Sequence, residues 1–166
     1  MAFETIEFNG RDYPKYETNG FAARFCFAFA KEVCAGFGYD IGCNRKEWAL
    51  PGAEPIDPAI DGCGFDAYNL PPLQADYIFS SHCLEHLTDW VAAIDYWHSK
   101  LKDGGVMFLY LPHPDQEYWL PWNNRKHIHS FSPRIIEEYL RQRRWSKVMV
   151  TFGADAYHSF TVIAKK

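Results

Sequence analysis

The sequence predicts an α/β fold with a mostly parallel central sheet, and three observations support this class. Short, apolar, β-favouring segments alternate with segments whose apolar residues have helical spacing. A glycine turn at Gly42 follows the apolar segment 37–41, and an acid, Asp57, ends the next short segment. Two closing segments, 148–152 and 159–164, are joined by a loop and predict an antiparallel strand at the C-terminus.

Length and composition favour one domain, 1–166, in which residues 1–20 form a hairpin and lead-in and residues 21–166 form the core. The chain is 48% hydrophobic and 23% charged, which allows an ordinary core. A net charge of −4 without a basic block argues against a nucleic-acid partner. No signal peptide or membrane span is visible, so no membrane association is expected. The sequence does not indicate an oligomeric state.

The five cysteines are scattered, odd in number and without a C-x-x-C pair. This spacing favours reduced thiols over a disulfide framework or a zinc knuckle. We therefore expect a cytoplasmic protein.

The N-terminal third predicts a hairpin, a helix and the first parallel strand. Asn9-Gly10 accepts the positive φ angles of a tight turn, so residues 5–13 are expected to form a hairpin. Residues 21–35 are apolar all round, which predicts a helix buried against the sheet and ended by Gly36. The strand 37–41 follows.

The next segments predict three more strands with little helix between them. Residues 45–50 can make only about a turn and a half of helix before Pro51-Gly52. A short strand at 53–57 leads into a loop at 57–64 that contains Pro58, Gly62 and Gly64. Strands are expected at 65–70 and at 76–80. The helices after the first two strands are therefore expected to be shortened.

The second half predicts a helix at 84–102, ended by Asp103-Gly104-Gly105, and a buried strand at 106–111. The aromatic, proline-interrupted segment 113–129 is expected to be a functional loop or lid. Ser132 and Pro133 predict the start of a helix that runs to Leu140.

Four segments in order carry a family resemblance. They are Asp40-Ile41-Gly42-Cys43, Ile56-Asp57, Asp66-Ala67-Tyr68-Asn69-Leu70-Pro71, and 76–87 followed by Leu101-Lys102-Asp103-Gly104-Gly105. Together they resemble the strand ends of class I S-adenosylmethionine-dependent methyltransferases, closest to the type 11-like group. His127-Ile128-His129-Ser130-Phe131-Ser132-Pro133 also resembles a segment of this group. The resemblance implies the Rossmann-like methyltransferase fold and S-adenosylmethionine as cofactor.

The resemblance also implies residue roles. Asp57 would accept both ribose hydroxyls, since a carboxylate accepts two hydrogen bonds at once. Asp66 and the Ala67 amide would hold adenine, Gly42 would admit the methionine part, and Asp40 would help hold its ammonium group. Turn chemistry is the alternative role for Asp57 and Asp66. The expected cofactor-binding set is Asp40, Gly42, Cys43, Asn44, Asp57, Asp66, Ala67, Ser81 and His82.

The glycine loop departs from the family pattern. The family continues with Gly-x-Gly, whereas Asn44-Arg45-Lys46 follows Cys43 here. Asn44 tolerates a left-handed conformation and can replace one glycine. The altered loop suggests an alternative function, a binding or interaction protein that keeps the fold without catalysis.

His82-x-x-Glu85-His86 also has the pattern of a zinc peptidase helix, which gives a remote alternative, a zinc hydrolase. Zinc hydrolysis needs two histidines on one helix face, a third ligand and a glutamate base. His82 lies at the end of a predicted strand, before the helix, and the family resemblance accounts for the same residues without a metal. No metal site is therefore expected.

Methyl transfer is an in-line displacement from a sulfonium and needs a base only if the acceptor must lose a proton. His86, His113, His127 and His129 are the candidate bases. Tyr118, Trp119 and Trp122 are expected either to line an acceptor pocket or to cover the core or an oligomer contact. The acceptor is expected to be a small molecule or a glycan-type intermediate.

Overall fold

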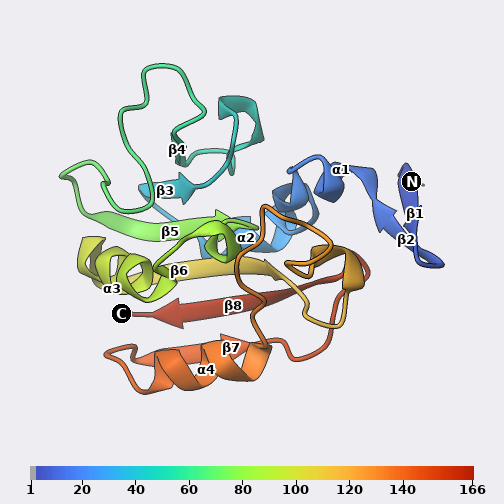
Figure 1. Cartoon of the computed structure of the whole chain (residues 1–166). Helices are drawn as coiled ribbons and strands as arrows, with labels where there is room; N and C mark the ends of the chain where they lie inside the picture. Colours follow the sequence, from blue (N-terminus) through green and yellow to red (C-terminus); the bar gives the residue numbers. More distant parts are fainter. Residues whose placement is uncertain (1–2) are drawn as a thin grey trace.

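The computed structural model describes residues 3–166 and contains a two-stranded hairpin beside a six-stranded sheet (Figure 1). The first two residues of the predicted domain, 1–2, lie outside the described residues. The strands are β1 (Thr5–Phe8), β2 (Arg11–Pro14), β3 (Gly38–Ile41), β4 (Glu54–Ile56), β5 (Ala75–Ser81), β6 (Leu101–Pro112), β7 (Lys147–Val150) and β8 (Ser159–Lys165). The α-helices are α1 (Lys15–Thr18), α2 (Phe27–Val33), α3 (Trp90–Lys100) and α4 (Pro133–Arg141); the 3₁₀ turns are η1 (Ala22–Phe25), η2 (Lys46–Trp48), η3 (Leu84–His86) and η4 (Glu117–Trp119).

The large sheet has the strand order β4-β3-β5-β6-β8-β7. Neighbours from β4 to β6 pair in parallel, whereas β8 is antiparallel to both β6 and β7. This arrangement confirms the predicted α/β class, the mostly parallel sheet and the antiparallel C-terminal strand.

Helices cover both faces of this sheet. In β6, Met107 and Leu109 pack in the core beneath α3 and α4, whereas Phe108 and Tyr110 pack in a second core beneath η1 and α2. Because alternate residues of a strand point to opposite faces, a strand covered on both sides must be apolar throughout. This explains why the central strands appear in the sequence as continuous apolar runs.

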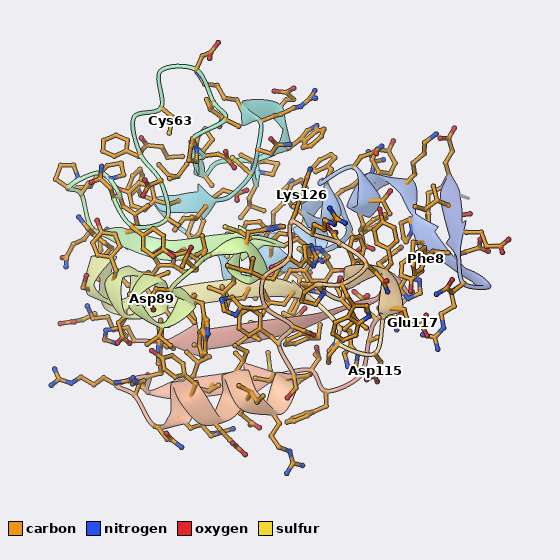
Figure 2. The ribbon with its side chains drawn as sticks, viewed as in Figure 1. Phe8, Cys63, Asp89, Asp115, Glu117 and Lys126 are labelled. Atoms are coloured by element: carbon orange, nitrogen blue, oxygen red, sulfur yellow. The ribbon has the colours of Figure 1, made fainter. Side chains whose placement is uncertain are left out.

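The predicted hairpin is confirmed, with Asn9 and Gly10 at φ +50° and +74° in its turn. It docks on the long loop that follows β6, where Phe8 lies beside Glu117 and Asp115 (Figure 2). The Asn9 side chain donates to Glu117 at 2.8 Å, and the Arg11 guanidinium donates to the Asp115 carbonyl at 3.0 Å. The hairpin therefore supports the loop 113–129 from outside.

The single helix expected at 21–35 is wrong, because the chain turns at Cys26 between η1 and α2. Phe25 stacks on Tyr157 with ring centroids 3.9 Å apart, while Phe27 packs against Phe79 of the sheet. These contacts favour two short pieces over one continuous helix. The helix α2 packs against the sheet, as expected of this apolar segment, through Phe27 on Phe79 and Phe29 on Phe108; its outer side is open, since only Ala30 is fully buried and Phe29 is 41% exposed.

The helix expected at 84–102 is divided as well. The Asp89 side chain accepts the Ala92 N–H at 2.9 Å and caps α3, which separates it from η3 (Figure 2). The segment Asp103-Gly104-Gly105 lies inside β6 and does not end the helix, since β6 already pairs with β5 at Leu101.

The strand expected at 65–70 is wrong. Asp66 and Asn69 exchange both backbone hydrogen bonds, at 3.1 and 3.2 Å, and form a tight turn instead. The Trp97 indole fixes this turn by donating to the Ala67 carbonyl at 2.8 Å. The shortened helices are confirmed within the described residues, since only η2 follows β3 and no helix follows β4. No helix of residues 3–166 has the length and apolar character needed to cross a membrane.

Candidate functional site

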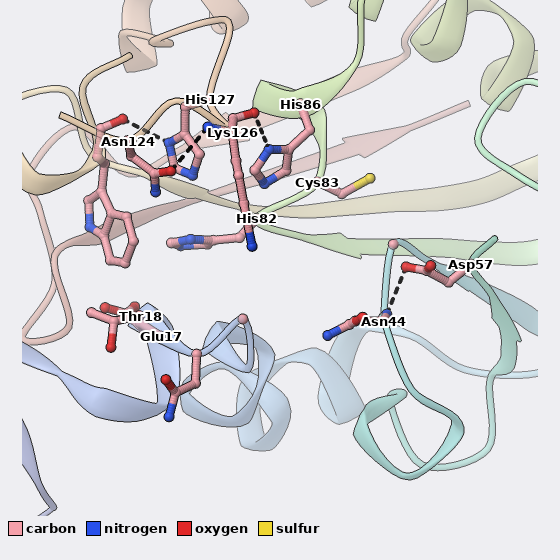
Figure 3. A pocket seen from close by; sticks show the side chains of 14 residues that line it. Glu17, Thr18, Asn44, Asp57, His82, Cys83, His86, Asn124, Lys126 and His127 are labelled. Atoms are coloured by element: carbon pink, nitrogen blue, oxygen red, sulfur yellow. Dashed lines mark hydrogen bonds between the residues drawn. The ribbon is translucent and has the colours of Figure 1, made fainter. Parts of the chain in front are cut away.

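A cleft of about 540 Å³ opens at the carboxyl ends of β3 and β5 (Figure 3). The strand that follows β3 in the sequence, β4, lies on one side of it, whereas β5 and then β6 lie on the other side. The order of the strands therefore reverses between β3 and β5. Ligands of open α/β sheets bind at this kind of switch point. Three groups of residues form the walls: 17–20 from the N-terminal segment, Gly42, Asn44 and Asp57 beside β3, and His82, Cys83, His86, Trp119, Asn124, Lys126 and His127 opposite.

The turn after β3 is held very close to the end of β5. Gly42 has φ +85°, and a Cβ on it would lie 2.4 Å from the Cys83 sulfur. Only glycine fits this position, because both the backbone conformation and the space exclude a side chain. Asn44 is also left-handed, at φ +64°, as its expected substitution for a glycine requires.

Asp57 fixes the same turn through both carboxylate oxygens. Oδ2 accepts the Asn44 N–H at 2.7 Å, and Oδ1 accepts the Ala59 N–H at 2.8 Å. Each oxygen has a second lone pair, and the half-buried side chain lines the cleft. Turn chemistry and ligand binding are therefore compatible at Asp57, and its free acceptors fit a pair of sugar hydroxyls.

The residues that break the glycine pattern do not fill the cleft. Arg45 is exposed, with its guanidinium 4.6 Å over the Trp48 ring and 3.9 Å from Glu47. Lys46 is exposed in η2. Neither side chain lines the cleft, so the altered loop leaves room for a ligand.

Three predicted binding residues are buried away from the cleft surface. The Asp40 carboxyl accepts the Leu50 N–H at 2.6 Å, and burial raises its pKa to about 8. Cys43 and Ser81 are buried as well, and neither lines the cleft. Asp40 therefore holds the segment after η2 through Leu50, and its raised pKa favours the neutral carboxyl at neutral pH.

Asp66 and Ala67, expected at the adenine, form the tight turn described above. Asp66 Oδ1 accepts the Tyr68 N–H at 2.7 Å. These two residues are not among those that line the cleft. Their part in binding stays a prediction.

The structure brings three histidines together at the cleft. His82, left-handed at φ +46°, follows β5, His86 ends η3, and His127 lies in the loop after β6. Burial lowers the pKa of all three, that of His127 to about 4, so each is neutral at neutral pH. They are available as proton acceptors.

The other two candidate bases lie elsewhere. His113 is buried, bonds the Phe152 carbonyl through Nε2 at 3.0 Å, and accepts the Asp115 N–H through Nδ1. His129 bonds the Leu87 carbonyl through Nε2 at 3.0 Å. Neither lines the cleft, and both hold loops in place.

Sequence reasoning missed Glu17, which lies in the N-terminal wall. Its Oε1 accepts from Ser159 Oγ at 3.2 Å, and Ser159 Oγ in turn lies 2.8 Å from His82 Nε2. Burial raises the pKa of Glu17 well above its ordinary value. The sequence holds no signal for this chain of contacts, because 142 residues separate Glu17 from Ser159.

Of the three loop aromatics, Trp119 lines the cleft. It is buried and stacks on His127 with an interplanar angle of 16°. Tyr118 packs against Phe8 and Tyr13 of the hairpin, and Trp122 is 74% exposed. Only Trp119 is thus placed to shape the cleft.

The zinc-hydrolase alternative is not supported. A zinc peptidase presents two histidines one helical turn apart on the same face. Here His82 precedes the turn in a left-handed conformation, and η3 spans only Leu84–His86. Glu85 is completely buried and is not exposed to the cleft as a base would be.

Solved structures share this fold at low sequence identity. An S-adenosylmethionine-dependent methyltransferase from Archaeoglobus fulgidus is 16% identical, with a TM-score of 0.66 over 92% of this chain and 97% of its own. A Thermotoga maritima protein described as a possible histamine N-methyltransferase is 15% identical, with a TM-score of 0.70 over 91% and 92% of the chains. The 1,6-didemethyltoxoflavin-N1-methyltransferase of Burkholderia thailandensis, solved with 1,6-didemethyltoxoflavin and S-adenosylhomocysteine, is 14% identical, with a TM-score of 0.66 over 90% and 80%.

No curated protein matches the chain. A family model described as a methyltransferase domain matches residues 21–148, which is most of the sequence and contains two of the three groups that line the cleft, all but residues 17–20. The family resemblance in the sequence is thereby confirmed. The protein belongs to the methyltransferase-domain family, and S-adenosylmethionine is the cofactor that this family and this fold indicate.

Proposed function

We propose that the protein is an S-adenosylmethionine-dependent methyltransferase whose cofactor lies across the ends of β3 and β5. Asp57 would bind the ribose hydroxyls, and the turn at Gly42 and Asn44 would bind the methionine part. The observation that carries this proposal is the left-handed glycine turn at the switch point, with a carboxylate beside it that has lone pairs to spare.

The opposite wall supplies the chemistry at the acceptor. When bound, S-adenosylmethionine supplies an electrophilic methyl group. His82, His86 and His127 are neutral and can accept a proton from an acceptor hydroxyl or amine. The buried Trp119 ring stacks on His127 and limits the access of water to this side.

We further propose that the acceptor is a small molecule; a glycan-type acceptor remains within the same proposal. The cleft volume lies in the range of small-ligand pockets and must hold both cofactor and acceptor. The toxoflavin-precursor enzyme is a fold neighbour solved with a small acceptor. All five cysteines are free, which supports the expected location in a reducing compartment such as the cytoplasm.

The test compares D57N with D61N by isothermal titration with S-adenosylhomocysteine. Asp61 is exposed in the same loop and does not line the cleft, so it is the matched control. D57N replaces one acceptor oxygen with an amide donor and should weaken binding at least ~10-fold, since one charged hydrogen bond contributes about 1.5–3 kcal/mol. Equal affinities of D57N and D61N would contradict the assignment of Asp57.

The alternative, a binding or interaction protein without catalysis, is favoured by Asn44-Arg45-Lys46 in place of the family glycines. It predicts that S-adenosylhomocysteine neither binds nor raises the melting temperature. R45G separates the two functions, because a gain in affinity would show that the altered loop limits binding. Turnover on any acceptor would rule out the alternative.

A further inference from the structure

Glu85 is buried directly behind the cleft wall, next in sequence to the cleft-lining residue His86. The Glu85 side chain is 0% exposed, and among residues 3–166 neither carboxylate oxygen has a hydrogen-bond partner. Burying a carboxylate without a partner is strongly unfavourable. Within residues 3–166, the Glu85 carboxyl group is therefore buried without a hydrogen bond that would offset the cost of its burial.

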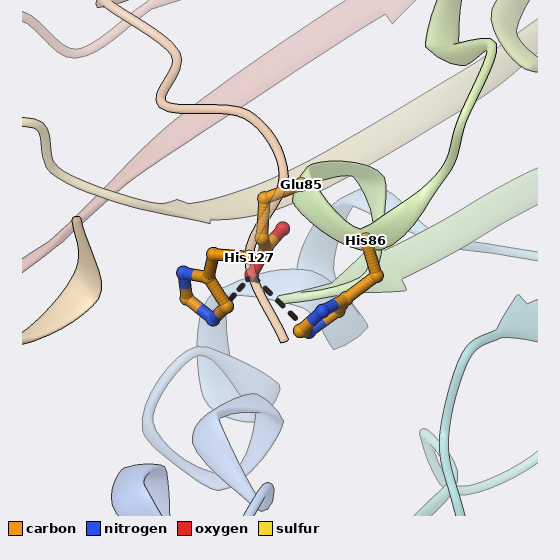
Figure 4. A group of neighbouring side chains, drawn as sticks. All are labelled: Glu85, His86 and His127. Carbon is orange, nitrogen blue, oxygen red and sulfur yellow. Dashed lines mark ion pairs between the residues drawn. The ribbon is translucent and has the colours of Figure 1, made fainter. Parts of the chain in front are cut away.

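Three imidazoles surround one oxygen of this carboxylate. His86 Nε2 lies 3.9 Å from Glu85 Oε1, His127 Nε2 lies 3.8 Å from it, and His82 Nδ1 also lies 3.8 Å from it. Figure 4 shows Glu85 between His86 and His127, with both rings turned toward it. These distances are too long for hydrogen bonds, so a proton on Glu85 would still lack an acceptor.

The other ring nitrogens fix which atoms face Glu85. His86 Nδ1 lies 2.6 Å from the Lys126 carbonyl, and His127 Nδ1 lies 2.7 Å from the Trp119 carbonyl. A carbonyl oxygen only accepts, so both Nδ1 atoms carry the proton. In the neutral rings, each Nε2 therefore presents a lone pair toward Glu85. A cation bound between these lone pairs and the carboxylate would replace their repulsion with attraction.

The same contacts are those of a metal site. Metal-binding histidines donate their second ring N–H to a backbone carbonyl or carboxylate, which orients the ring. Glu85, His86 and His127 each offer one ligand atom, and these atoms lie within 4.8 Å of one another. Two bonds of ~2.1 Å at the tetrahedral angle separate ligand atoms by ~3.4 Å, so each histidine nitrogen would have to approach the Glu85 oxygen by about 0.4–0.5 Å to close on an ion.

Backbone contacts hold the two halves of the group together. The N–H groups of Ile128 and His129 donate to the Glu85 carbonyl at 2.9 and 3.1 Å. They fix the loop that carries His127 onto η3, so the ligand atoms do not depend on a mobile segment for their approach.

We propose that Glu85, His86 and His127 bind a divalent transition-metal ion at the edge of the cleft. Two imidazoles and one carboxylate favour Zn²⁺ or Fe²⁺ over Mg²⁺ or Ca²⁺, which prefer oxygen ligands. His82, with Nδ1 turned to the same oxygen, is the nearest candidate for a fourth ligand. The ion would use the Nε2 lone pairs of His86 and His127, so in the metal-bound protein these two rings would not accept a proton from the acceptor. Both rings line the cleft, so the ion would lie at its border.

The test is titration of the chelator-treated full chain with Zn²⁺, and with Co²⁺ as a spectroscopic probe. We expect one equivalent to bind and Co²⁺ to give a visible absorption band. E85Q keeps the side-chain shape, and H127A removes one ligand. Loss of a hydrogen-bond partner of a metal ligand weakens metal binding ~10–100-fold, so loss of a ligand itself should weaken Zn²⁺ binding by more than this. H129A is the control, because it removes an imidazole of the same loop that also bonds a carbonyl.

Several results would overturn the metal site. They are the absence of saturable Zn²⁺ binding, an E85Q affinity equal to wild type, or an equal loss of affinity in H129A. Circular dichroism identifies variants that do not fold. If H127A does not fold, the comparison of E85Q with the wild type and H129A still tests the metal site. Titrating the same samples with S-adenosylhomocysteine separates this proposal from the proposed function, since metal binding and cofactor binding can each fail while the other remains.

Discussion

Substituting Gly42 by alanine tests the close approach on which the cleft depends. At φ +85° an alanine is strained by ~1–2 kcal/mol. Its Cβ would lie 2.4 Å from the Cys83 sulfur and 2.5 Å from the Cys83 Cβ, which adds an overpacking cost of ~1–3 kcal/mol. We expect G42A to lower the free energy of unfolding by ~2–5 kcal/mol in total.

The matched control is G52A. Gly52 has φ +96°, but a Cβ there meets nothing within 4 Å. Both variants share the backbone strain and the lower entropy of the unfolded chain, so these effects cancel in the comparison. The difference between the two variants, ~1–3 kcal/mol, isolates the contact with β5.

The assay is urea unfolding followed by circular dichroism, combined with titration of S-adenosylhomocysteine. We expect G42A to lose both stability and affinity relative to G52A. The double variant G42A/C83G should recover part of the stability. Glycine is chosen at position 83 because alanine would keep the Cβ that lies 2.5 Å from the new Cβ of residue 42. Equal unfolding free energies for G42A and G52A would refute the close approach.

Three further predictions concern groups that support the cleft. Burial raises the pKa of Asp40 to about 8, so between pH 3.8 and pH 8 the folded state keeps a proton that the unfolded chain has lost, and stability falls as pH rises. In urea unfolding, D40N should make this fall shallower by up to ~1.4 kcal/mol per pH unit. An unchanged slope in D40N would contradict the raised pKa of Asp40. S132A removes the N-cap of α4 and should cost ~0.5–2 kcal/mol in a thermal melt, whereas the exposed S130A should cost little; similar losses would argue against the cap. W97F leaves the Ala67 carbonyl without its donor and should lower the free energy of unfolding in urea by ~1–3 kcal/mol, and unchanged stability would show that this hydrogen bond does not hold the turn. A parallel loss of affinity for S-adenosylhomocysteine would show that the turn contributes to the binding site.

Local sequence signals predicted much of the sheet and its hairpin. Asn9-Gly10 specifies its turn within two residues, and the apolar runs of β5 and β6 reflect burial on both faces. The turn at Gly42 was also predictable, because its conformation depends on a glycine and not on distant partners.

The errors fall where distant residues decide the local conformation. The segment 65–70 has strand-like composition, but the Trp97 indole, 30 residues from Ala67, holds it in a turn. The helix at 21–35 is divided because Phe25 stacks on Tyr157 across the chain. Patterns read within a short window contain neither of these contacts.

The candidate site shows the same division. Asp57 and Asn44 were predicted beside the turn, and the structure joins them by a hydrogen bond of 2.7 Å. The grouping of His127 with His86 and Glu85 depends on how the loop after β6 folds back onto η3, which spacing in the sequence does not specify.

Whether the cleft between β3 and β5 binds the cofactor can be measured by isothermal titration of the wild-type full chain with S-adenosylhomocysteine. We expect saturable binding of one equivalent, and stabilisation in a thermal melt of about 2.7 kcal/mol at a hundredfold excess over Kd. A folded protein that shows neither heat of binding nor any shift in melting temperature at millimolar ligand would contradict it.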